Sequence, residues 1–448
     1  MAEQVIEVRI WNQRVGAVAA DPRAGCHAFE YDPRWRRGGV ELAPLTLPLA
    51  ASRSAVLFPS LPEATYRGLP GLLSDALPDD FGNALIDAWM AREGVPKGAI
   101  TALDRLAYMG KRGMGALEFR PARGSHRESA RPLEMKRLVE AARAVVTGTL
   151  SEDDMTKAAI ENIIRVGTSA GGARAKAVIA WNPTTSEVRS GQFDVAEGFE
   201  HWLLKFDGLG KDSELGATGH YGRIEYAYHL MAVAAGVDME PCRLLLENGR
   251  AHFMTKRFDR DNNAKHHVQT LCAMQHLDYK QRATHAYEQY LETIATLGLG
   301  HEALDQAFTR ACFNVATKNC DDHTKNFAFR LREGAAWELA PAYDITHAYN
   351  PKGEWTYQHL MSINGQFARI SERDLLVLAD RFGVRAPGAI IRRVDEAVAD
   401  WAGHAEAAGV PASVTEQIRQ HHHQLAERKP RRGAHATART ERGQRTMP

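Results

Sequence analysis

One short polar stretch constrains the fold of this chain more than any other feature. Residues 319–326 read Asn-Cys-Asp-Asp-His-Thr-Lys-Asn and combine two acids, an imidazole, an ammonium and an amide. Before it, apolar residues recur at three- and four-residue steps over 304–315, which predicts a helix with one buried stripe. After it, segments 327–331 and 337–339 flank a turn and predict a short β-hairpin, and Asp344 follows. The predicted order is helix, polar loop, hairpin and acid.

That order resembles the catalytic half of a protein kinase, where Asp-x-x-x-x-Asn lies on the loop and a second Asp follows the hairpin. Asp321 and Asn326 have this spacing, and Asp344 has the later position. The loop acid would accept a hydroxyl proton, while the amide oxygen and the second acid are hard oxygen ligands for Mg²⁺. The alternative is purely structural, because Asp and Asn are also common turn and cap residues. The upstream residues have to decide between these interpretations.

Composition excludes several other classes of protein. The chain has 448 residues, of which 44% are hydrophobic and 25% charged, as in a globular protein of two or three domains. Lys and Arg total 56 against 55 Asp and Glu, so no overall field attracts nucleic acid or an anionic membrane. Five scattered cysteines without a Cys-x-x-Cys pair argue for a reducing compartment and against a disulfide frame or zinc site. With no signal peptide and no membrane-spanning apolar run, we expect a cytoplasmic protein without membrane partners.

The front of the chain, residues 1–120, predicts a β-rich unit finished by helices. Three segments have the alternation or composition of half-buried strands: 5–11, 15–18 and 28–31. Glycine and proline then interrupt the chain before a predicted helix over 81–90. The glycine-rich segment 110–115 lacks a strand-to-helix frame and is predicted to be a loop. This unit contains no reactive constellation.

A second glycine-rich segment leads directly into a strand. Residues 167–177 read Gly-Thr-Ser-Ala-Gly-Gly-Ala-Arg-Ala-Lys-Ala, and the predicted strand covers 177–181. Ala173 and Arg174 replace the Lys-Ser/Thr of a Walker loop, and a strand follows where that loop has a helix. Small residues still let successive amides close on a phosphate, whose charge Arg174 and Lys176 would offset. The alternative is a flexible loop without a ligand.

A lysine inside an apolar strand marks the next element. Residues 201–206 read His-Trp-Leu-Leu-Lys-Phe, and a buried ammonium at Lys205 is costly unless an anion meets it. A glycine loop followed by a strand, a turn and a strand-borne Lys is typical of the nucleotide-gripping half of a kinase. Glu225, on a predicted helix over 223–235, is either the carboxylate partner of this lysine or a solvated surface residue. Segment 252–260 is predicted to be the strand and exit that join two lobes.

Together these motifs resemble the HipA family of bacterial toxin kinases. The similar segments, in chain order, are 167–176, Leu-Leu-Lys-Phe at 203–206, Lys-Arg-Phe-Asp-Arg at 256–260, Cys-Asp-Asp-His-Thr-Lys-Asn at 320–326 and Ala-Tyr-Asp at 342–344. The opening strands, Leu-Leu-Ser-Asp-Ala-Leu-Pro-Asp at 72–79 and His-Leu-Met-Ser-Ile-Asn-Gly at 359–365 are also similar, so the resemblance extends to about residue 425. Each piece is common by itself, whereas the combination is highly specific.

The resemblance implies an α+β, two-lobed protein-kinase-like fold, with a β-rich N-terminal lobe of two subdomains and a C-terminal lobe dominated by helices. Residues 1–120 would form the subdomain that contacts an antitoxin, and 121–260 the nucleotide-gripping part with the Gly-rich loop and the strand lysine. Residues 261–427 would form the helical lobe with the catalytic loop and the metal-binding Asp. The basic tail, 428–448, is predicted to be disordered. His421–His423 resembles a metal tract, but it ends a polar helix and is expected to face solvent.

The resemblance also implies an activity and partners. Members of the family are ATP- and Mg²⁺-dependent serine/threonine protein kinases that act as the toxins of type II toxin-antitoxin systems. They modify aminoacyl-tRNA synthetases, which arrests translation and favours dormancy. The expected partners are therefore a protein substrate of that class, a helix-turn-helix antitoxin, and operator DNA reached through the antitoxin.

Carried onto this sequence, the resemblance makes Asp321 the general base, Asn326 and Asp344 the metal ligands, and Lys205 the clamp on the α- and β-phosphates. The residues that would cover the phosphates are Ala170, Gly171, Gly172, Ala173, Arg174, Ala175 and Lys176. Phe258 would flank the adenine. Lys256 would adjoin the same position, but some relatives carry Glu there, which leaves a side-chain contact from this residue open.

Four further residues complete the expected site. Lys325 could neutralise the transferring phosphoryl group, and His323 is either a second catalytic-loop participant or a brace for the loop. Ser169 falls at the family's autophosphorylation site, with Thr168 beside it as a second acceptor. A phosphate there would oppose closure of the loop on the phosphates of ATP, so self-phosphorylation would switch the enzyme off.

Two other classes of function remain open at this level. The chain could act chiefly as a binding module, a co-repressor held by the antitoxin on operator DNA with weak or absent catalysis. It could also phosphorylate small molecules, as some kinase-like folds do. The complete set of Lys205, Asp321, Asn326 and Asp344 argues against an inactive module, and the β-rich front unit favours the toxin.

Overall fold

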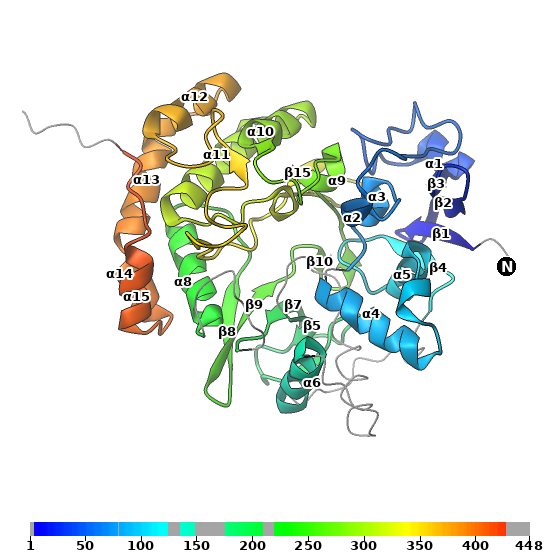
Figure 1. Cartoon of the computed structure of the whole chain (residues 1–448), viewed down its shortest axis with the longest axis horizontal. Coiled ribbons are helices and arrows are strands. Elements are labelled where there is room, and N and C mark those ends of the chain that lie inside the picture. Colours follow the sequence, from blue (N-terminus) through cyan, green and yellow to red (C-terminus); the bar gives the residue numbers. More distant parts are fainter. Residues whose placement is uncertain (1–3, 79, 124–134, 148–174, 209–218, 427–448) are drawn as a thin grey trace, which may run out of the picture.

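The computed structural model describes residues 4–78, 80–123, 135–147, 175–208 and 219–426. Within these ranges the chain is a mixed α+β protein built on three hydrophobic clusters. The N-terminal sheet lies at one side of the molecule and the last helices form a column at the opposite side (Figure 1). Of the predicted phosphate-covering segment 170–176, residues 170–174 lie outside the described residues. The predicted phosphorylation sites Thr168 and Ser169 and the tail 428–448 lie outside them too.

The front of the chain forms an antiparallel four-stranded sheet in the order β3-β2-β1-β4. Its strands are β1 (Val5–Ile10), β2 (Gln13–Asp21), β3 (Cys26–Tyr31) and β4 (Glu118–Arg120). Alternate residues of β1 point into the core, where Ile6 and Val8 are fully buried. The intervening helices are α1 (Pro33–Gly38), α2 (Glu63–Tyr66), α3 (Gly71–Ser74), α4 (Asp80–Arg92), η1 (Lys97–Ala99) and α5 (Ala102–Met109). We call residues 4–120 the N-terminal unit; its predicted strands and helix are confirmed, and 110–115 is a loop.

A second antiparallel sheet has five strands in the order β6-β5-β7-β9-β8. They are β5 (Lys176–Trp181), β6 (Val188–Ser190), β7 (Glu200–Lys205), β8 (Cys242–Glu247) and β9 (Arg250–Lys256). On one face, apolar side chains of α4 and of α6 (Met135–Thr147) pack against β5. On the other face lies α8 (Tyr221–Ala234), whose Gly222 approaches β9 so closely that a Cβ would lie 2.0 Å from the carbonyl oxygen of Ala251. The sheet thus has helices on both faces, and β5, which lies between β6 and β7, is buried along its whole length.

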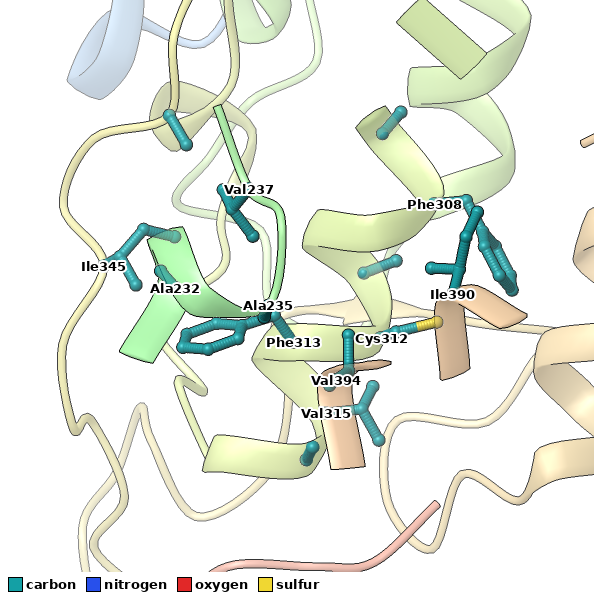
Figure 2. Packing of buried hydrophobic residues seen from close by; sticks show 14 of the residues in the cluster. Ala232, Ala235, Val237, Phe308, Cys312, Phe313, Val315, Ile345, Ile390 and Val394 are labelled. Atoms are coloured by element: carbon teal, nitrogen blue, oxygen red, sulfur yellow. The ribbon is translucent and has the colours of Figure 1, made fainter. Parts of the chain in front are cut away.

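The largest hydrophobic cluster is helical, with α11 (Gly300–Thr317) at its centre (Figure 2). Phe308, Cys312 and Phe313 of α11 pack with residues of α8 and α13, as Figure 2 shows. The other helices of this part are α9 (Leu271–Gln275), α10 (Tyr287–Thr296), α12 (Glu372–Phe382), α13 (Pro387–Ala399), α14 (Trp401–Ala407) and α15 (Ala412–Arg419). More of α11 is buried than the single stripe that the sequence predicted. Residues 307–317 are all buried, because α10, α12 and α13 all pack against this helix.

Short strands connect the second sheet to the helices. They are β10 (Arg260–Asp261), β11 (Ala264–Lys265), β12 (His267–Thr270), β13 (His285–Ala286), β14 (Ala328–Leu331), β15 (Trp337–Leu339) and β16 (Met361–Ser362). The predicted hairpin is confirmed as β14 and β15, and β12 pairs with β14 on its other side. The polar loop before it contains the 3₁₀ turn η2 (Thr324–Asn326). This pairing places the loop beside the start of α9.

The expectation that the histidine tract faces solvent was wrong for two of its three residues. His421 stacks on His347, with 3.0 Å between their ring nitrogens, and His422 lies 3.0 Å from the hydroxyl of Tyr228. The chain after α15 folds back onto the helical core, where the backbone N–H of His423 donates to the carbonyl of Ala316. Among the described residues, no group of three or more His, Cys, Asp or Glu could hold a metal ion. Within the same ranges, no helix has the length and apolarity needed to cross a membrane.

Candidate active site

A cavity of about 570 Å³ lies where the second sheet, the polar loop and the N-terminal unit meet. The predicted site residues that line it are Lys176, Lys205, Glu225, Lys256, Phe258, Asp321, His323, Lys325, Asn326 and Asp344. Ala175 is different, since it packs into the cluster formed with α4 and α6 and does not line the cavity. The fold thus gathers residues from the middle and the end of the chain around one space.

Lys205 is the electrostatic centre of this cavity. It ends β7, is 9% exposed, and its ammonium donates to the carboxylates of both Glu225 and Asp344. Burial by itself would lower the pKa of Lys205, but the charges of Asp344 and Glu225 raise it above its ordinary value. Glu225 is only 2% exposed, so the alternative of a solvated surface glutamate does not apply. The buried ammonium is therefore paired with two carboxylates, which offset the cost of burying its charge.

Asp344 approaches Lys205 from the other side of the cavity. Burial would raise the pKa of Asp344, yet Lys205 and Lys176 outweigh that effect and lower the pKa to about 2. Its backbone has φ = 54°, in the left-handed region that non-glycine residues seldom occupy. Such conformations cost free energy and persist where the surroundings enforce them, often at functional sites. The preceding Tyr343 donates its hydroxyl to the carbonyl of Lys325 at 2.6 Å, which ties this segment to the polar loop.

The polar loop is held in shape by its own hydrogen bonds. The side-chain nitrogen Nδ2 of Asn326 donates to the backbone carbonyl of Asp321 at 2.7 Å. The side-chain oxygen of Asn326 is therefore the atom that can ligate a cation. The side chain of Asp321 is 49% exposed, and its Oδ1 lies 3.8 Å from Nε2 of His323. The ring of Tyr279 lies 5.2 Å from the ring of His323 and 4.9 Å from the ammonium of Lys325. Tyr279 therefore supports both residues from one side.

Burial separates the two adjacent acids of the loop. Asp322 is 0% exposed and accepts hydrogen bonds from the Leu360 backbone at 2.8 Å and the Tyr287 hydroxyl at 2.9 Å. Its other partner is Nδ1 of His359, at 2.8 Å. Burial would lower the pKa of His359, but Cys320 and the carboxylate of Asp322 raise it to about 10, so these surroundings favour the charged imidazole. Asp322 anchors the loop to the helical core, and Asp321 is the acid left to face the cavity.

The segment that follows β9 is hydrogen-bonded to the N-terminal unit. Asp259 is fully buried and accepts from Arg257 at 2.7 and 2.9 Å, from Arg260 at 2.7 Å, and from the backbone N–H of Gly115 at 2.7 Å. Burial would raise the pKa of Asp259, but the two guanidinium groups lower it well below its usual range. Phe258 lies between Arg257 and Asp259 in the chain, so the bonds between these two residues hold it against the cavity.

Two contacts beside this segment bear on the predicted adenine position. The ring of Phe258 stacks with that of Tyr343 at 5.7 Å, so two aromatic rings stand side by side in the cavity wall. Lys256 donates to Glu200 on the neighbouring strand at 2.7 Å, with both side chains about one-third exposed. An exposed pair of this kind contributes little free energy. Lys256 is therefore engaged with β7 and is only weakly held.

The residues of the cavity fit a magnesium nucleotide by their chemistry. Mg²⁺ is bound in proteins by one or two carboxylates together with substrate phosphates, and Asp344 with the amide oxygen of Asn326 supplies such oxygens. Lys176, Lys205 and Lys325 place three ammonium groups on the same cavity, which suits a chain of phosphates.

Sequence reasoning missed Asp75, Tyr279 and Tyr343, which also line the cavity. One signal was available for Asp75, because it is an acid within the run 71–78, whose other residues are buried. The argument that singled out Lys205, a charge in an apolar run, applies equally to it. The two tyrosines carried no such signal, since buried aromatic rings are ordinary core residues.

These features suggest the class of the protein. A strand lysine paired with a helix glutamate, an Asp and an Asn on one loop, and an acid after a hairpin lie around one cavity, and this arrangement is similar to that of protein-kinase-type sites. The chain belongs to the HipA family: the model of the HipA-like C-terminal domain matches residues 168–402, more than half of the chain, and that of the HipA N-terminal domain matches 6–120. No curated protein sequence matches the chain significantly.

A solved structure with a similar fold comes from a toxin-antitoxin system. The chain is similar to a structure of the toxin-antitoxin system of Shewanella oneidensis MR-1, a complex of HipA, HipB and operator DNA, with a TM-score of 0.64 and 18% identity. That similarity covers 93% of this chain and 95% of the other. A proinflammatory kinase of Helicobacter pylori, CtkA, is more distant, with a TM-score of 0.34 and 10% identity over 56% of this chain and 92% of the other.

Proposed function

We propose that this protein is an ATP- and Mg²⁺-dependent serine/threonine protein kinase that acts as the toxin of a type II toxin-antitoxin system. The observation that carries the proposal is the bridge of Lys205 between Glu225 and Asp344, in the cavity that also holds Asp321 and Asn326. In the proposed two-lobed arrangement, the second sheet and the helical part are the lobes on either side of this cavity. In phosphoryl transfer, charges arranged in this way position the phosphates of the nucleotide and stabilise the charge that develops on the transferred group.

Each of these residues has a role that follows from its position. Asp321, the exposed acid of the loop, would accept the proton of the acceptor hydroxyl as its oxygen attacks phosphorus. Asn326 and Asp344 would hold the metal, whose charge, together with that of the nucleotide's phosphates, completes the site when both are bound. Lys205 would hold the α- and β-phosphates, and Glu225 would keep its ammonium oriented.

The remaining predicted residues support these steps. Lys325 would neutralise charge on the transferring group, and His323 would position Asp321, its neighbour at 3.8 Å. Phe258 and Tyr343 offer the apolar ring surface against which an adenine can stack. The segment Ala170–Lys176 would cover the phosphates, and phosphate on Ser169 or Thr168 would repel them and switch the enzyme off.

The biological setting follows from family membership and from the fold. The similarity in fold to HipA in its complex with HipB and operator DNA spans nearly the whole chain, which supports an analogous partnership here. We propose a helix-turn-helix antitoxin as partner, with operator DNA reached through it. The proposed substrate is a cytoplasmic protein, an aminoacyl-tRNA synthetase, whose phosphorylation would inhibit translation.

The test is transfer of labelled phosphate from ATP in the presence of Mg²⁺ by the purified full-length chain. Asp321→Asn should reduce the rate by roughly 100- to 10,000-fold, the usual cost of losing a general base. Asp261→Asn, at an exposed acid of β10, is the matched control and should leave the rate unchanged. Equal labelling by Asp321→Asn and wild type would remove Asp321 from its role. An unlabelled wild type that still binds antitoxin and operator DNA would instead identify a binding module.

A further inference from the structure

The N-terminal unit supplies one acid to the cavity. Asp75 follows α3 directly, and the residues on either side of it, 71–74 and 76–78, are buried. Asp75 itself is partly accessible, because its side chain lines the cavity together with Lys325 and Asp321. A partly buried carboxylate is costly unless hydrogen-bond donors or positive charges lie close to it. We therefore expect such partners among the residues around the cavity.

Asp75 is bonded to the segment that lies beside the polar loop. Its Oδ2 accepts from the backbone N–H of Thr270 at 2.6 Å, and its Oδ1 accepts from the Thr270 hydroxyl at 2.9 Å. Thr270 is paired with Ala328 across β12 and β14, and the next residue, Leu271, donates its N–H to the carbonyl of Phe327 at 2.7 Å. Both contacts meet the chain immediately after the polar loop. The carboxylate of Asp75 therefore fixes the backbone that holds the end of this loop.

Asp75 also interacts with the loop through charge. Burial raises the pKa of Asp75, and the ammonium of Lys325 is the strongest influence that opposes this rise. Lys325 is oriented by the ring of Tyr279 and by the bond from the Tyr343 hydroxyl to its carbonyl, so its backbone and its side chain are both held near the cavity. Asp75 thus supplies a negative charge that attracts this ammonium from the N-terminal side.

We propose that Asp75 is a positioning residue of the phosphotransfer site: it holds the end of the catalytic loop through Thr270 and orients the ammonium of Lys325 in the cavity. The N-terminal unit then completes the active site in addition to any antitoxin contact. This inference rests on the function proposed above, because it assigns Lys325 to the transfer step.

Another contact of the same interface provides a matched control. The hydroxyl of Tyr66 donates to the carbonyl of Cys272 at 3.1 Å, so it joins the N-terminal unit to the start of α9 just as Asp75 does. Tyr66 carries no charge and does not line the cavity. Tyr66→Phe removes an interface hydrogen bond and leaves Lys325 untouched. A merely structural role for Asp75 would make the two substitutions alike.

The first measurement is the initial rate of ATP consumption with Mg²⁺ by the full-length chain, with an excess of dephosphorylated casein supplying the serine and threonine hydroxyls that accept the phosphoryl group. Asp75→Asn should lower kcat roughly tenfold and leave the KM for ATP within about twofold, because a transition-state contact is lost and ground-state binding is kept. Tyr66→Phe should leave kcat unchanged. In a Lys325→Met background, Asp75→Asn should have a clearly smaller effect, since the interaction of the two charges is gone and only the bonds to Thr270 are still altered. An unchanged kcat for Asp75→Asn, or an equal loss in both backgrounds, would overturn the proposal.

The second measurement needs no enzymatic activity. The equilibrium constants for unfolding of wild type, Asp75→Asn, Lys325→Met and the double variant form a cycle that isolates the interaction of the two side chains. We expect the product of the single effects to differ from the double effect by roughly tenfold, as for neighbouring charged groups. Effects that multiply within about twofold would refute the proposed interaction of the two charges. A wild type that consumes no ATP would refute the proposed function, and this cycle would still decide the role of Asp75.

Discussion

The buried pair of His359 and Asp322 makes a quantitative prediction about pH and stability. Folding raises the pKa of His359 from 6.5 to about 10, so the folded state binds this proton more tightly than the unfolded chain does. The stabilisation is therefore fully present below about pH 6.5 and is lost as the pH rises through about 10. The pair anchors the loop that carries Asp321, which makes its strength relevant to the active site.

The size of the effect follows from the two pKa values. Linkage gives a contribution to the free energy of unfolding of about 4 kcal/mol at pH 7 and about 1 kcal/mol at pH 9. His359→Asn keeps a neutral N–H donor near the position of Nδ1 and removes the charge. The difference in the free energy of unfolding between wild type and this variant should therefore shrink by about 3 kcal/mol between pH 7 and pH 9.

Urea unfolding followed by circular dichroism at both pH values measures this difference. Groups that titrate far from His359 affect both proteins equally and cancel, and Cys320, whose sulfur lies 3.9 Å from the imidazole, is replaced by Ser in both proteins. His267→Asn is the matched control, because burial lowers the pKa of His267 to about 4 and this imidazole is neutral throughout the range. Its effect on stability should be the same at pH 7 and pH 9. A His359→Asn effect that is also independent of pH would refute the charged pair as the anchor of the loop.

Three further substitutions test other parts of the structure. Glu225→Gln should lower kcat/KM for ATP roughly tenfold, because the ammonium of the strand lysine loses one of its two anions; an unchanged value would remove this glutamate from the site. Gly222→Ala places a Cβ 2.0 Å from a backbone oxygen of β9 and should cost about 1–3 kcal/mol in thermal unfolding, whereas Gly98→Ala meets open space and should not. Asp259→Asn leaves two buried arginines poorly paired and should cost about 3–5 kcal/mol in urea unfolding. Asp261→Asn, at an exposed position, should stay within about 0.5 kcal/mol, and equal costs would contradict the role of Asp259 in holding the segment that follows β9.

Neighbouring acids show where sequence reasoning succeeds and where it stops. The spacing to Asn326 selected Asp321, and the structure places Asp321 on the cavity. Nothing local shows that Asp322 is fully buried, because its partner His359 is 37 residues away in the chain. Asp75 and Thr270 are 195 residues apart, and no periodicity links them. Contacts across such separations depend on how the elements pack.

The amino-acid sequence by itself determined many of the strands and helices, the order of the motifs and the family, because these depend on neighbouring residues and short spacings. It also marked Lys205 as a charge in need of a partner. Only the tertiary structure decided that this partner is both Glu225 and Asp344, and that the N-terminal unit lines the same cavity. The physical reason is that the energy of a charge depends on its burial and on the charges around it, and packing alone brings those groups together.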